Sequence, residues 1–430
     1  MVKKIVPSEV VNRPLNLPSS KSVAHRALII LSFSTKHSKL YNVTFNDDVN
    51  ATIDVLTNLG IKFNKIDSTT LEIDSSNLFI DVKKEFNVLE SGTTLRLLLP
   101  FLAFLDDEIT IYTKGNLINR PLNVYEEIFN KDKLNLEIFK EQNYLKIYQK
   151  LDTNTFKIRG DVSSQFVSGL LLYEALIKKS GDLTVLKPFE SKSYVDLTVD
   201  MLKYFGYEYI VKETETEVLY TLNEKNIQEK FYQEYYVEAD LSSLAFLIVL
   251  GIINNDLSFN GVNQKSLQAD YKVIDIIKKM NGKISFDKES KLIVEKSDLS
   301  SIIIDLKECP DLGPILMALV SLMDCQTKFI NTKRLAYKES NRALAMKEEL
   351  EKIGAKVSIM ENEIIVQGVK EVPNGQTFDS HNDHRITMSL AIVSTIFKTP
   401  SYFKNAECVK KSYPEFFEDL EKLGIGVSNA

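Results

Sequence analysis

Six segments that are apolar on almost every side constrain the fold of this chain more than any other feature. They span 24–34, 93–104, 164–176, 241–253, 310–323 and 384–397. Because a helix that is hydrophobic all round must be buried, each segment predicts a helix inside a core. The chain has 430 residues, and single cores stop growing at roughly 250–300 residues. We therefore expect two domains that share the six buried helices.

A second kind of segment alternates with these and carries apolar residues at helical spacing on one face. The copies span 49–63, 123–138, 195–209, 271–286, 345–359 and 417–428. All but the copy at 123–138 end at or near a glycine, which can close a helix in the left-handed conformation. Their starts lie about 72 to 76 residues apart, a regularity expected of a duplicated unit. The predicted fold class is α/β (α+β), with three repeats in each domain, every repeat joining a buried helix, a half-exposed helix and short strands.

Composition excludes several classes of protein. The net charge of −6 argues against a surface built for nucleic acid, which carries a basic surplus. The longest apolar runs, 244–253 and 313–323, are too short to span a membrane, and the start MVKKIVPSEVV lacks the apolar region of a signal peptide. Three cysteines, Cys309, Cys325 and Cys408, form no CxxC pair and predict no disulfide framework. We expect a cytoplasmic protein.

The histidines offer little for a metal site. Of the four, His381 and His384 are close enough in sequence to share a helix face. Zinc and iron sites need three or four convergent ligands. We therefore predict no metal site.

The starts of the buried helices carry unexpected charge. Ser, Asp, Gly and Asn there are ordinary N-cap residues, but basic residues are disfavoured at this end by the helix dipole. Four nevertheless cluster near these starts, namely Lys21, Arg26, Arg96 and Arg385. Free backbone N–H groups together with cations form a site for phosphate or carboxylate. The pattern predicts an enzyme that holds small anionic substrates.

Nine short motifs stand along the chain in a fixed order. They are LPSSKSVAHR (17–26), SGTTLR (91–96), NRP (119–121), SSQF (163–166), ESKSYVDLT (190–198), PDLGP (310–314), KESNR (338–342), NDHR (382–385) and KKSYP (410–414). With these motifs the chain resembles the 5-enolpyruvylshikimate-3-phosphate synthase family over essentially its whole length. The resemblance implies six βαβαββ-type units in two domains, with the active site in the cleft between them.

The resemblance also implies the domain boundaries. One domain would be discontinuous and comprise 1–18 and 235–430, and the other, 19–234, would be inserted into it. The discontinuous domain would carry Asp311, Lys338, Glu339, Arg342, His384, Arg385 and Lys411. The inserted domain would make most of the contacts to shikimate 3-phosphate, one of the two substrates that the resemblance implies.

The reaction implied by the resemblance transfers the enolpyruvyl group of phosphoenolpyruvate to the 5-hydroxyl of shikimate 3-phosphate. It releases phosphate, in the pathway to chorismate and the aromatic amino acids. It implies no metal or organic cofactor, no partner besides the two substrates and a monomeric enzyme. Paired Arg and Lys would neutralise the phosphates and carboxylates, while an acid and a base would move protons.

Position by position, the resemblance assigns catalysis to Asp311 as the base for the attacking hydroxyl and to Glu339 as the proton donor to carbon. Lys21 and His384 are further candidates for proton transfer. Residues implied around shikimate 3-phosphate are Ser163, Ser164 and Ser191 at its phosphate, Ser22 and Arg26 at its carboxylate, Gln165 and Tyr194 in the pocket, and Lys338 at the ring hydroxyls. Residues implied around phosphoenolpyruvate are Lys21, Gly92, Arg120, Arg342, Arg385 and Lys411.

Several of these residues have a purely structural interpretation. Asp311 follows Pro310 at a helix start and could be an N-cap, and Glu339 could be a first-turn acid that stabilises the helix dipole. The chain also departs from the usual family pattern at Ser20, His25, Glu90, Leu97, Ser193 and Asn341. Glu90 adds a carboxylate near the expected phosphoenolpyruvate site, where it would repel an anion or recruit Arg96.

Two other functions fit parts of the pattern. The sister enolpyruvyl transferase that acts on UDP-N-acetylglucosamine typically carries a catalytic-loop cysteine in its first half, whereas every cysteine here follows residue 300. A non-catalytic anion-binding homologue would keep the cations and lose the acid and base. Asp311, Glu339 and His384 are all present, which favours the shikimate enzyme.

Overall fold

The structure is a computed structural model that describes residues 1–105, 108–131, 136–148, 150–227 and 232–430. The chain divides into two compact units. Unit 1 comprises 1–18 and 238–430, and unit 2 comprises 19–237. The sequence placed the second boundary at 234/235. The chain stays in unit 2 until residue 237 because strand β13 (Tyr232–Tyr236) pairs in parallel with β2 (His37–Tyr41).

The described residues of unit 2 form three sheets, each of four strands. The first has the order β13, β2, β4 (Leu71–Asp74), β3 (Lys62–Lys65). The second has the order β5 (Glu85–Asn87), β6 (Ile109–Tyr112), β8 (Tyr144–Ile147), β7 (Leu136–Phe139). The third has the order β11 (Tyr209–Glu213), β12 (Glu217–Leu222), β10 (Asp182–Leu186), β9 (Thr155–Arg159).

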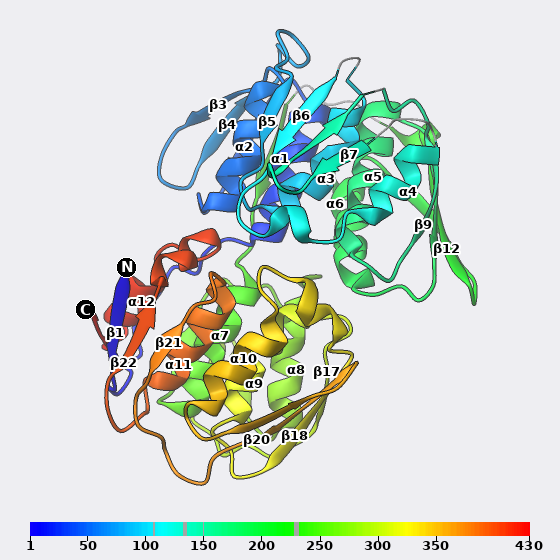
Figure 1. Cartoon of the computed structure of the whole chain (residues 1–430). Helices are drawn as coiled ribbons and strands as arrows, with labels where there is room; N and C mark the ends of the chain where they lie inside the picture. Colours follow the sequence, from blue (N-terminus) through cyan, green and yellow to red (C-terminus); the bar gives the residue numbers. More distant parts are fainter. Residues whose placement is uncertain (106–107, 132–135, 149, 228–231) are drawn as a thin grey trace. The chain divides into compact units, whose positions relative to one another are not determined.

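The helices of unit 2 are of the two kinds expected. The largely buried helices are α1 (Lys21–Ser34), α3 (Gly92–Ala103) and α5 (Ser164–Tyr173). The helices with one buried face are α2 (Asp47–Asn58), α4 (Asn123–Lys131) and α6 (Lys192–Tyr204). In Figure 1 the helices of this unit gather on the inner side of its sheets, because their apolar faces need cover that the sheets provide.

Unit 1 repeats this plan with β14–β16 and β17–β20 and a sheet that includes the first strand of the chain. The strands are β1 (Val2–Val6), β14 (Leu257–Phe259), β15 (Lys283–Phe286), β16 (Leu292–Glu295), β17 (Ile303–Asp305), β18 (Gln326–Ile330), β19 (Lys356–Ile359), β20 (Glu363–Gln367), β21 (Thr377–Asp379), β22 (Ser401–Lys404) and β23 (Gly426–Asn429). The helices are α7 (Leu241–Ile253), α8 (Lys272–Lys279), α9 (Gly313–Val320), α10 (Arg342–Glu351), α11 (His384–Ser394) and α12 (Phe416–Lys422). Of these, α7, α9 and α11 are the buried ones.

The repeat is clearest where it is continuous in sequence. β5, α3, β6, α4, β7 and β8 follow one another, with β5 parallel to β6 and the later strands antiparallel. Two repeats are instead completed by a strand distant in sequence: β13 adds to β2, and β1 pairs with β22 and β23. This closure explains why the first and last segments of the chain belong to one unit.

Among the predicted buried segments, α1 begins at Lys21 instead of 24, α11 ends at Ser394 instead of 397, and two segments include turns of another helix type. The segment 310–323 begins with a 3₁₀ turn, η5 (Pro310–Leu312), before α9 ends at Val320. The segment 164–176 passes from α5 into a π-helical turn, η2 (Glu174–Lys178). The start of α9 after η5 follows from Pro314, which has no N–H and suits the first turn of a helix.

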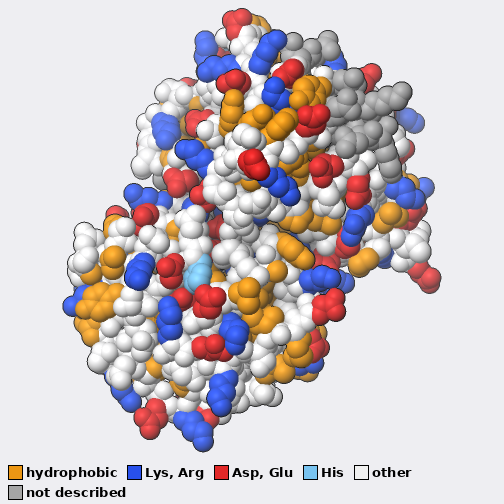
Figure 2. Space-filling view, viewed as in Figure 1, with side chains coloured by type: hydrophobic (Ala, Val, Ile, Leu, Met, Phe, Trp, Pro, Cys, Tyr) orange, Lys and Arg blue, Asp and Glu red, His pale blue; other side chains and the backbone are white. Residues whose placement is uncertain are grey.

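The surface agrees with the charge composition. In Figure 2 acidic and basic side chains alternate over the visible face of each unit, with scattered hydrophobic ones between them. That face lacks the continuous basic area that nucleic-acid binding requires. Among the described residues, no helix is long and apolar enough to cross a membrane.

Candidate active site

Serine caps open the three buried helices of unit 2. Ser20, Ser91 and Ser163 are the N-cap residues of α1, α3 and α5, and each side-chain oxygen accepts a hydrogen bond from a backbone N–H two or three residues later. These caps satisfy one of the donors that a helix start leaves open. The remaining N–H groups at each start can still face an anion.

Lys21, the first residue of α1, has a carboxylate partner that sequence reasoning missed. Its Nζ lies 2.8 Å from Oδ2 of Asp48, the second residue of α2. Both side chains are mostly buried, with 15% and 12% of their area exposed. The acidic pair at 47–48 signals a helix start, but nothing local in it indicates contact with Lys21.

Arg26 lies in the second turn of α1, deeper than the first-turn position expected from the sequence, and its side chain is buried. Its guanidinium donates to Thr198 Oγ1 (2.6 Å) and Ser168 Oγ (3.2 Å) and to the carbonyls of Ser22 and Tyr194. All four acceptors are neutral. Burial accordingly lowers the pKa of Arg26 to about 10, because the charge lacks a compensating carboxylate.

Two guanidinium groups converge on Gly92, the first residue of α3. A Cβ at this position would lie 2.8 Å from Nη1 of Arg120 and 3.1 Å from Nη1 of Arg96. A side chain at this position would displace the flexible ends of both arginines, so glycine permits the close approach of these cations to the helix start. Arg96 also donates to Oε1 of Gln165 (2.9 Å), whose amide donates to Thr93 Oγ1 (2.9 Å). The structure thus brings Gly92, Arg120 and Gln165 together.

Other predicted residues of unit 2 lie at the starts of α5 and α6. Ser164 is buried at the first position of α5. Ser191 is fully buried and left-handed (φ 50°) just before α6, where its carbonyl accepts the N–H of Tyr194 at 3.2 Å. Glu90 packs its carboxylate against Gly115, since a Cβ there would lie 2.6 Å from Glu90 Oε1.

Asp311 is the centre of a charge cluster in unit 1. Its Oδ1 accepts hydrogen bonds from Lys338 Nζ (2.9 Å) and Arg342 Nη1 (2.8 Å), and its Oδ2 lies 3.3 Å from Arg385 Nη2. Arg385 also donates to the backbone carbonyl of Asp311. Although Asp311 lies in η5 at the start of a helix, its side chain does not act as a cap.

These contacts shift the ionisation of both partners. Burial by itself would raise the pKa of Asp311, but Arg385, Lys338 and Arg342 hold it well below its usual value. Burial, together with Arg334 and Arg342, lowers the pKa of Lys338 to about 8 despite the attraction of Asp311. Asp311 is therefore a carboxylate at neutral pH, beside an ammonium that titrates close to neutrality.

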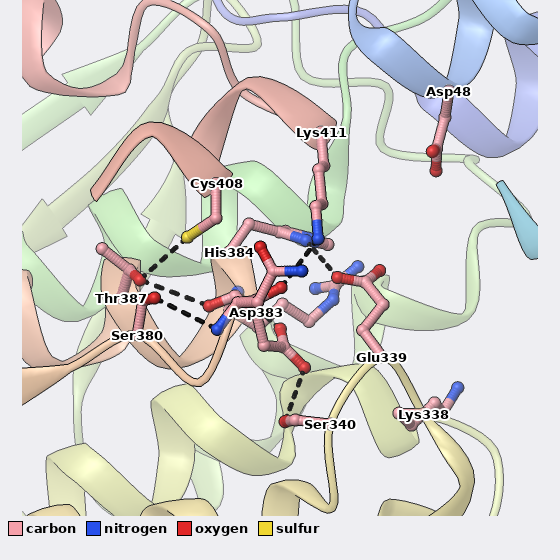
Figure 3. A network of polar contacts seen from close by, with 12 residues as sticks. Asp48, Lys338, Glu339, Ser340, Ser380, Asp383, His384, Thr387, Cys408 and Lys411 are labelled. Atoms are coloured by element: carbon pink, nitrogen blue, oxygen red, sulfur yellow. Dashed lines mark hydrogen bonds and ion pairs between the residues drawn. The ribbon is translucent and has the colours of Figure 1, made fainter. Parts of the chain in front are cut away.

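Arg342 has a second carboxylate partner, Asp383, which the sequence reasoning read only as part of a motif. Arg342 donates from Nε to Asp383 Oδ2 (2.8 Å) and from Nη2 to Oδ1 (3.2 Å). Asp383 also caps α11 and accepts from Ser340 Oγ at 3.1 Å, a contact drawn in Figure 3. Burial opposes the charge of Asp383, yet Arg342 keeps its pKa below the usual value.

Glu339 and His384 form an acid–imidazole pair. In Figure 3 the glutamate reaches from the loop before α10 toward the ring at the start of α11. His384 Nδ1 lies 2.8 Å from Glu339 Oε2, and the ring is buried. Such a pair fixes the orientation of the imidazole and can hold or pass on a proton.

Lys411 and Arg385 complete the set predicted in unit 1. Lys411, at the end of the 3₁₀ turn η7 (Ala406–Lys411), donates to the carbonyl of Asn382 at 2.7 Å. Asn382 directly precedes Asp383 in the loop that leads into α11. The structure therefore assembles all seven residues predicted for this unit around the start of α11 or the Asp311 cluster.

Two groups within the described residues bring possible metal ligands within 4.8 Å of one another: Glu339, Asp383 and His384, and separately Glu348, Glu349 and His381. In the first group Arg342 already neutralises Asp383. In the second, Lys352 lies 2.6 Å from Glu349. In each group a basic side chain already pairs with one of the carboxylates that a metal ion would need as a ligand. His381 and His384 also face different glutamates, so they do not form a shared ligand pair.

The model of EPSP synthase (3-phosphoshikimate 1-carboxyvinyltransferase) matches residues 5–420. The chain belongs to the EPSP synthase family. A curated 3-phosphoshikimate 1-carboxyvinyltransferase of Clostridium kluyveri is 39% identical over 418 residues, which cover 95% of this chain and 94% of that protein. The Clostridium perfringens enzyme is 36% identical, with 99% of both chains covered.

Solved structures show the same fold. An EPSP synthase from Acinetobacter baumannii superimposes with a TM-score of 0.79 at 22% identity and covers 100% of both chains. The enolpyruvyl transferase NikO from Streptomyces tendae has a TM-score of 0.74 at 14% identity, covering 99% of this chain and 98% of that one. The α/β fold predicted from the repeats is therefore confirmed as the fold of the EPSP synthase family.

Proposed function

We propose that this EPSP synthase family member transfers the enolpyruvyl group of phosphoenolpyruvate to the 5-hydroxyl of shikimate 3-phosphate. The observation that carries the proposal is the cluster of Asp311 with Lys338, Arg342 and Arg385, which places an ionised carboxylate among three cations. Relatives at 36–39% identity carry the name of this activity. The alternative acting on UDP-N-acetylglucosamine has no comparable support.

The groups of unit 2 suit anion binding. Ser163, Ser164 and Ser191, at the starts of α5 and α6, would bind the phosphate of shikimate 3-phosphate through hydroxyls and backbone N–H groups. Ser22 and Arg26 would serve its carboxylate, and Gln165 and Tyr194 would line the same pocket.

Each unit carries residues proposed for phosphoenolpyruvate. Lys21, Gly92 and Arg120 stand at two helix starts in unit 2, and Arg342, Arg385 and Lys411 are their counterparts in unit 1. Their cations would neutralise the phosphate and the carboxylate of phosphoenolpyruvate.

Proton transfer falls to the groups of unit 1. Asp311 would accept the proton of the 5-hydroxyl as its oxygen bonds to C2 of phosphoenolpyruvate, while Glu339, supported by His384, would protonate C3. Return of a proton from C3 to the Glu339 carboxylate, with cleavage of the bond between C2 and the phosphate oxygen, would then release phosphate and form the enol ether. Lys338 would hold the ring hydroxyl beside Asp311, and Lys21 remains a further candidate for proton transfer.

The charge cluster explains how Asp311 becomes a base. In the resting protein its pKa is depressed, so it is ionised but weakly basic. Each bound substrate brings negative charge to Arg342, Arg385 and Lys338, and a neighbouring negative charge raises a carboxyl pKa. Substrate binding would therefore increase the basicity of Asp311 at the step that needs it.

A phosphate-release assay tests this function. Purified protein is given shikimate 3-phosphate and phosphoenolpyruvate in buffer with a metal chelator, and we expect inorganic phosphate and enolpyruvyl product in equal amounts. Parallel reactions omit one substrate or replace shikimate 3-phosphate with UDP-N-acetylglucosamine. Turnover with the nucleotide sugar alone would reassign the enzyme, and binding without turnover of either would favour an anion-binding homologue.

We further propose that the enzyme acts as a cytoplasmic monomer. Every residue assigned above belongs to one chain, so the reaction requires no second copy. Cys309, Cys325 and Cys408 are free thiols, which suits a reducing compartment. Light scattering coupled to size exclusion should give the mass of one chain, 49.0 kDa, and a mass of twice that value would contradict the proposal.

A further inference from the structure

A chain of buried hydrogen bonds joins α1, α2 and α3 inside unit 2. His25 Nδ1 lies 2.7 Å from Thr52 Oγ1, which lies 2.7 Å from Thr94 Oγ1. Thr94 in turn contacts Ser91 Oγ at 2.8 Å. His25, Thr52 and Thr94 are completely inaccessible to solvent. None of the four residues in this hydrogen-bond chain is among those assigned above to a substrate.

The hydrogen bonds of the chain have one consistent direction. Burial, with help from Lys21 and Arg26, lowers the pKa of His25 to about 3 despite the opposing charge of Asp48, so the ring is neutral and carries one N–H. Its Nε2 is buried without a hydrogen-bond partner in the described part of the chain. A buried N–H left unsatisfied is rarer than an unsatisfied acceptor, which assigns the proton to Nδ1. His25 then donates to Thr52, and Thr52 donates to Thr94. The single hydroxyl proton of Thr94 faces two acceptors, Ser91 Oγ at 2.8 Å and the Asp48 carbonyl at 3.3 Å.

Thr94 and Ser91 of this hydrogen-bond chain stand beside two proposed phosphoenolpyruvate groups. Thr94 Oγ1 lies 3.3 Å from the carbonyl of Asp48, whose carboxylate holds Lys21. Ser91 caps α3 and directly precedes Gly92, the residue against which Arg120 packs. The chain thus links the start of α1 to the start of α3 through the first turns of α2.

We propose that His25, Thr52 and Thr94 form a positioning chain that fixes Lys21 and the Ser91–Gly92 turn relative to each other for binding of phosphoenolpyruvate. The inference rests on the proposed function, because it assigns these helix starts to that substrate. None of the three residues is expected to touch the substrate. They act through the helix starts, since an anion held between separate helices is bound well only when those helices are held in register.

Removing one hydroxyl tests the chain in the full-length protein. Thr94→Val and Thr52→Val keep the shape of the side chain and break the hydrogen bonds, and Thr113→Val is the matched control. Thr113 is a buried threonine of unit 2 whose hydroxyl donates to the Asn143 carbonyl, outside this chain. We expect the KM for phosphoenolpyruvate to rise about tenfold in the first two variants, the effect of losing roughly one buried hydrogen bond. The KM for shikimate 3-phosphate and kcat should change less than about twofold.

Substitutions at His25 add a rescue test. The side-chain amide nitrogen of asparagine stands the same number of bonds from Cα as Nδ1 of histidine, so His25→Asn can still donate to Thr52. His25→Leu fills similar space without a donor. We expect His25→Asn to keep a KM for phosphoenolpyruvate near that of the parent and His25→Leu to match Thr52→Val.

The outcomes separate the inference from the function on which it rests. If the parent protein has no turnover with the two substrates, the proposed function fails first. If the parent is active but both KM values rise together, or Thr113→Val has the same effect as Thr94→Val, the positioning chain is wrong. Should Thr94→Val fold poorly, Thr94→Ser against Thr94→Ala gives the same comparison, and equal phosphoenolpyruvate KM values for those two would also overturn the inference.

Discussion

Two buried arginines, one in each unit, have opposite surroundings. Arg26 in unit 2 and Arg342 in unit 1 are both 2% exposed. Arg26 donates to hydroxyls and backbone carbonyls, whereas Arg342 donates to the carboxylates of Asp311 and Asp383. Burial lowers the pKa of Arg26 to about 10. Burial also disfavours the charge of Arg342, but its acidic neighbours raise its pKa above the usual value.

This difference indicates how the chemistry is divided. A buried cation with neutral partners keeps its charge available to an anionic ligand, so the environment of Arg26 suits binding. A cation paired with carboxylates instead controls their pKa, so the environment of Arg342 suits proton transfer. Arg26 lies within the buried helix α1 and Arg342 begins α10. Their surroundings therefore favour anion binding at Arg26 and control of carboxylate pKa at Arg342.

Asp311→Ala should have the largest effect on activity. Removing the proposed base is expected to lower kcat by roughly 10²- to 10⁴-fold, while shikimate 3-phosphate should still bind. Steady-state kinetics and titration calorimetry with that substrate measure the two effects. Normal turnover in this variant would show that another group is the base. It would also contradict the assignment of proton transfer to the carboxylates around Arg342.

Asp383→Ala should have the largest effect on stability. It leaves the guanidinium of Arg342 buried with one carboxylate partner fewer, and breaking a buried ion pair costs about 3–5 kcal/mol of unfolding free energy. Thr198→Val removes a neutral acceptor of Arg26 and should cost about 1 kcal/mol. Urea unfolding compares the two.

Asp383→Asn keeps a hydrogen-bond acceptor at this position but removes the charge. Its loss of unfolding free energy should therefore lie between those of Asp383→Ala and Thr198→Val. Equal losses for Asp383→Ala and Thr198→Val would show that charge pairing does not distinguish the two arginines.

The pH profile should show the titration of Lys338. Because its pKa is about 8, the ammonium form is present below that pH and is lost above it. If the ammonium holds the ring hydroxyl, log kcat/KM should fall by about one per pH unit on the basic side. Lys338→Arg stays charged and should lose this limb, even if its overall rate is lower. An unchanged limb in Lys338→Arg would assign the titration to another group.

Glu174→Gln extends the comparison to buried acids and is expected to change the pH dependence of stability. Glu174 is fully buried, receives a hydrogen bond from Tyr209 and has no hydrogen-bond partner at Oε1 among the described residues. Burial raises its pKa well above 4.5, so the folded state keeps a proton that the unfolded state loses. Stability therefore falls as pH rises above about 4.5, by at most about 1.4 kcal/mol per pH unit.

The glutamine variant should lack this fall and be more stable than the parent at neutral pH. Thermal unfolding across the acidic to neutral range measures it. A parent and variant with parallel pH dependence would show that Glu174 is ionised in the folded protein.

Much of the fold could be predicted from local patterns. The buried helices were read from apolar periodicity, and glycines such as Gly60, Gly206 and Gly354 mark chain reversals after helices with positive φ. Periodicity could not predict which strands, distant in sequence, complete the sheets of the repeats. That β13 completes the first sheet of unit 2 depends on pairing between residues 37–41 and 232–236, and no local signal links segments so far apart.

The candidate site shows the same limit. Motif order pointed to Asp311, Lys338 and Arg342, which the structure brings within hydrogen-bonding distance. Asp48, Asp383 and Thr198 were missed as partners because a first-turn aspartate, an N-cap aspartate and a helical threonine each have an ordinary local explanation. Arg26 and Arg96 were placed in first helical turns and lie in the second turn, because the serine caps start these helices at Lys21 and Gly92.

The sequence by itself determined which segments must be buried helices, how often they recur and which residue types stand at their starts, because helix periodicity and capping depend on neighbours a few residues apart. Only the tertiary structure decided which side chains contact each buried charge. Arg26 and Thr198 are 172 residues apart and Arg342 and Asp383 are 41 apart. Whether a buried arginine finds a hydroxyl or a carboxylate depends on how whole helices pack, and that choice separates a binding site from an acid–base cluster.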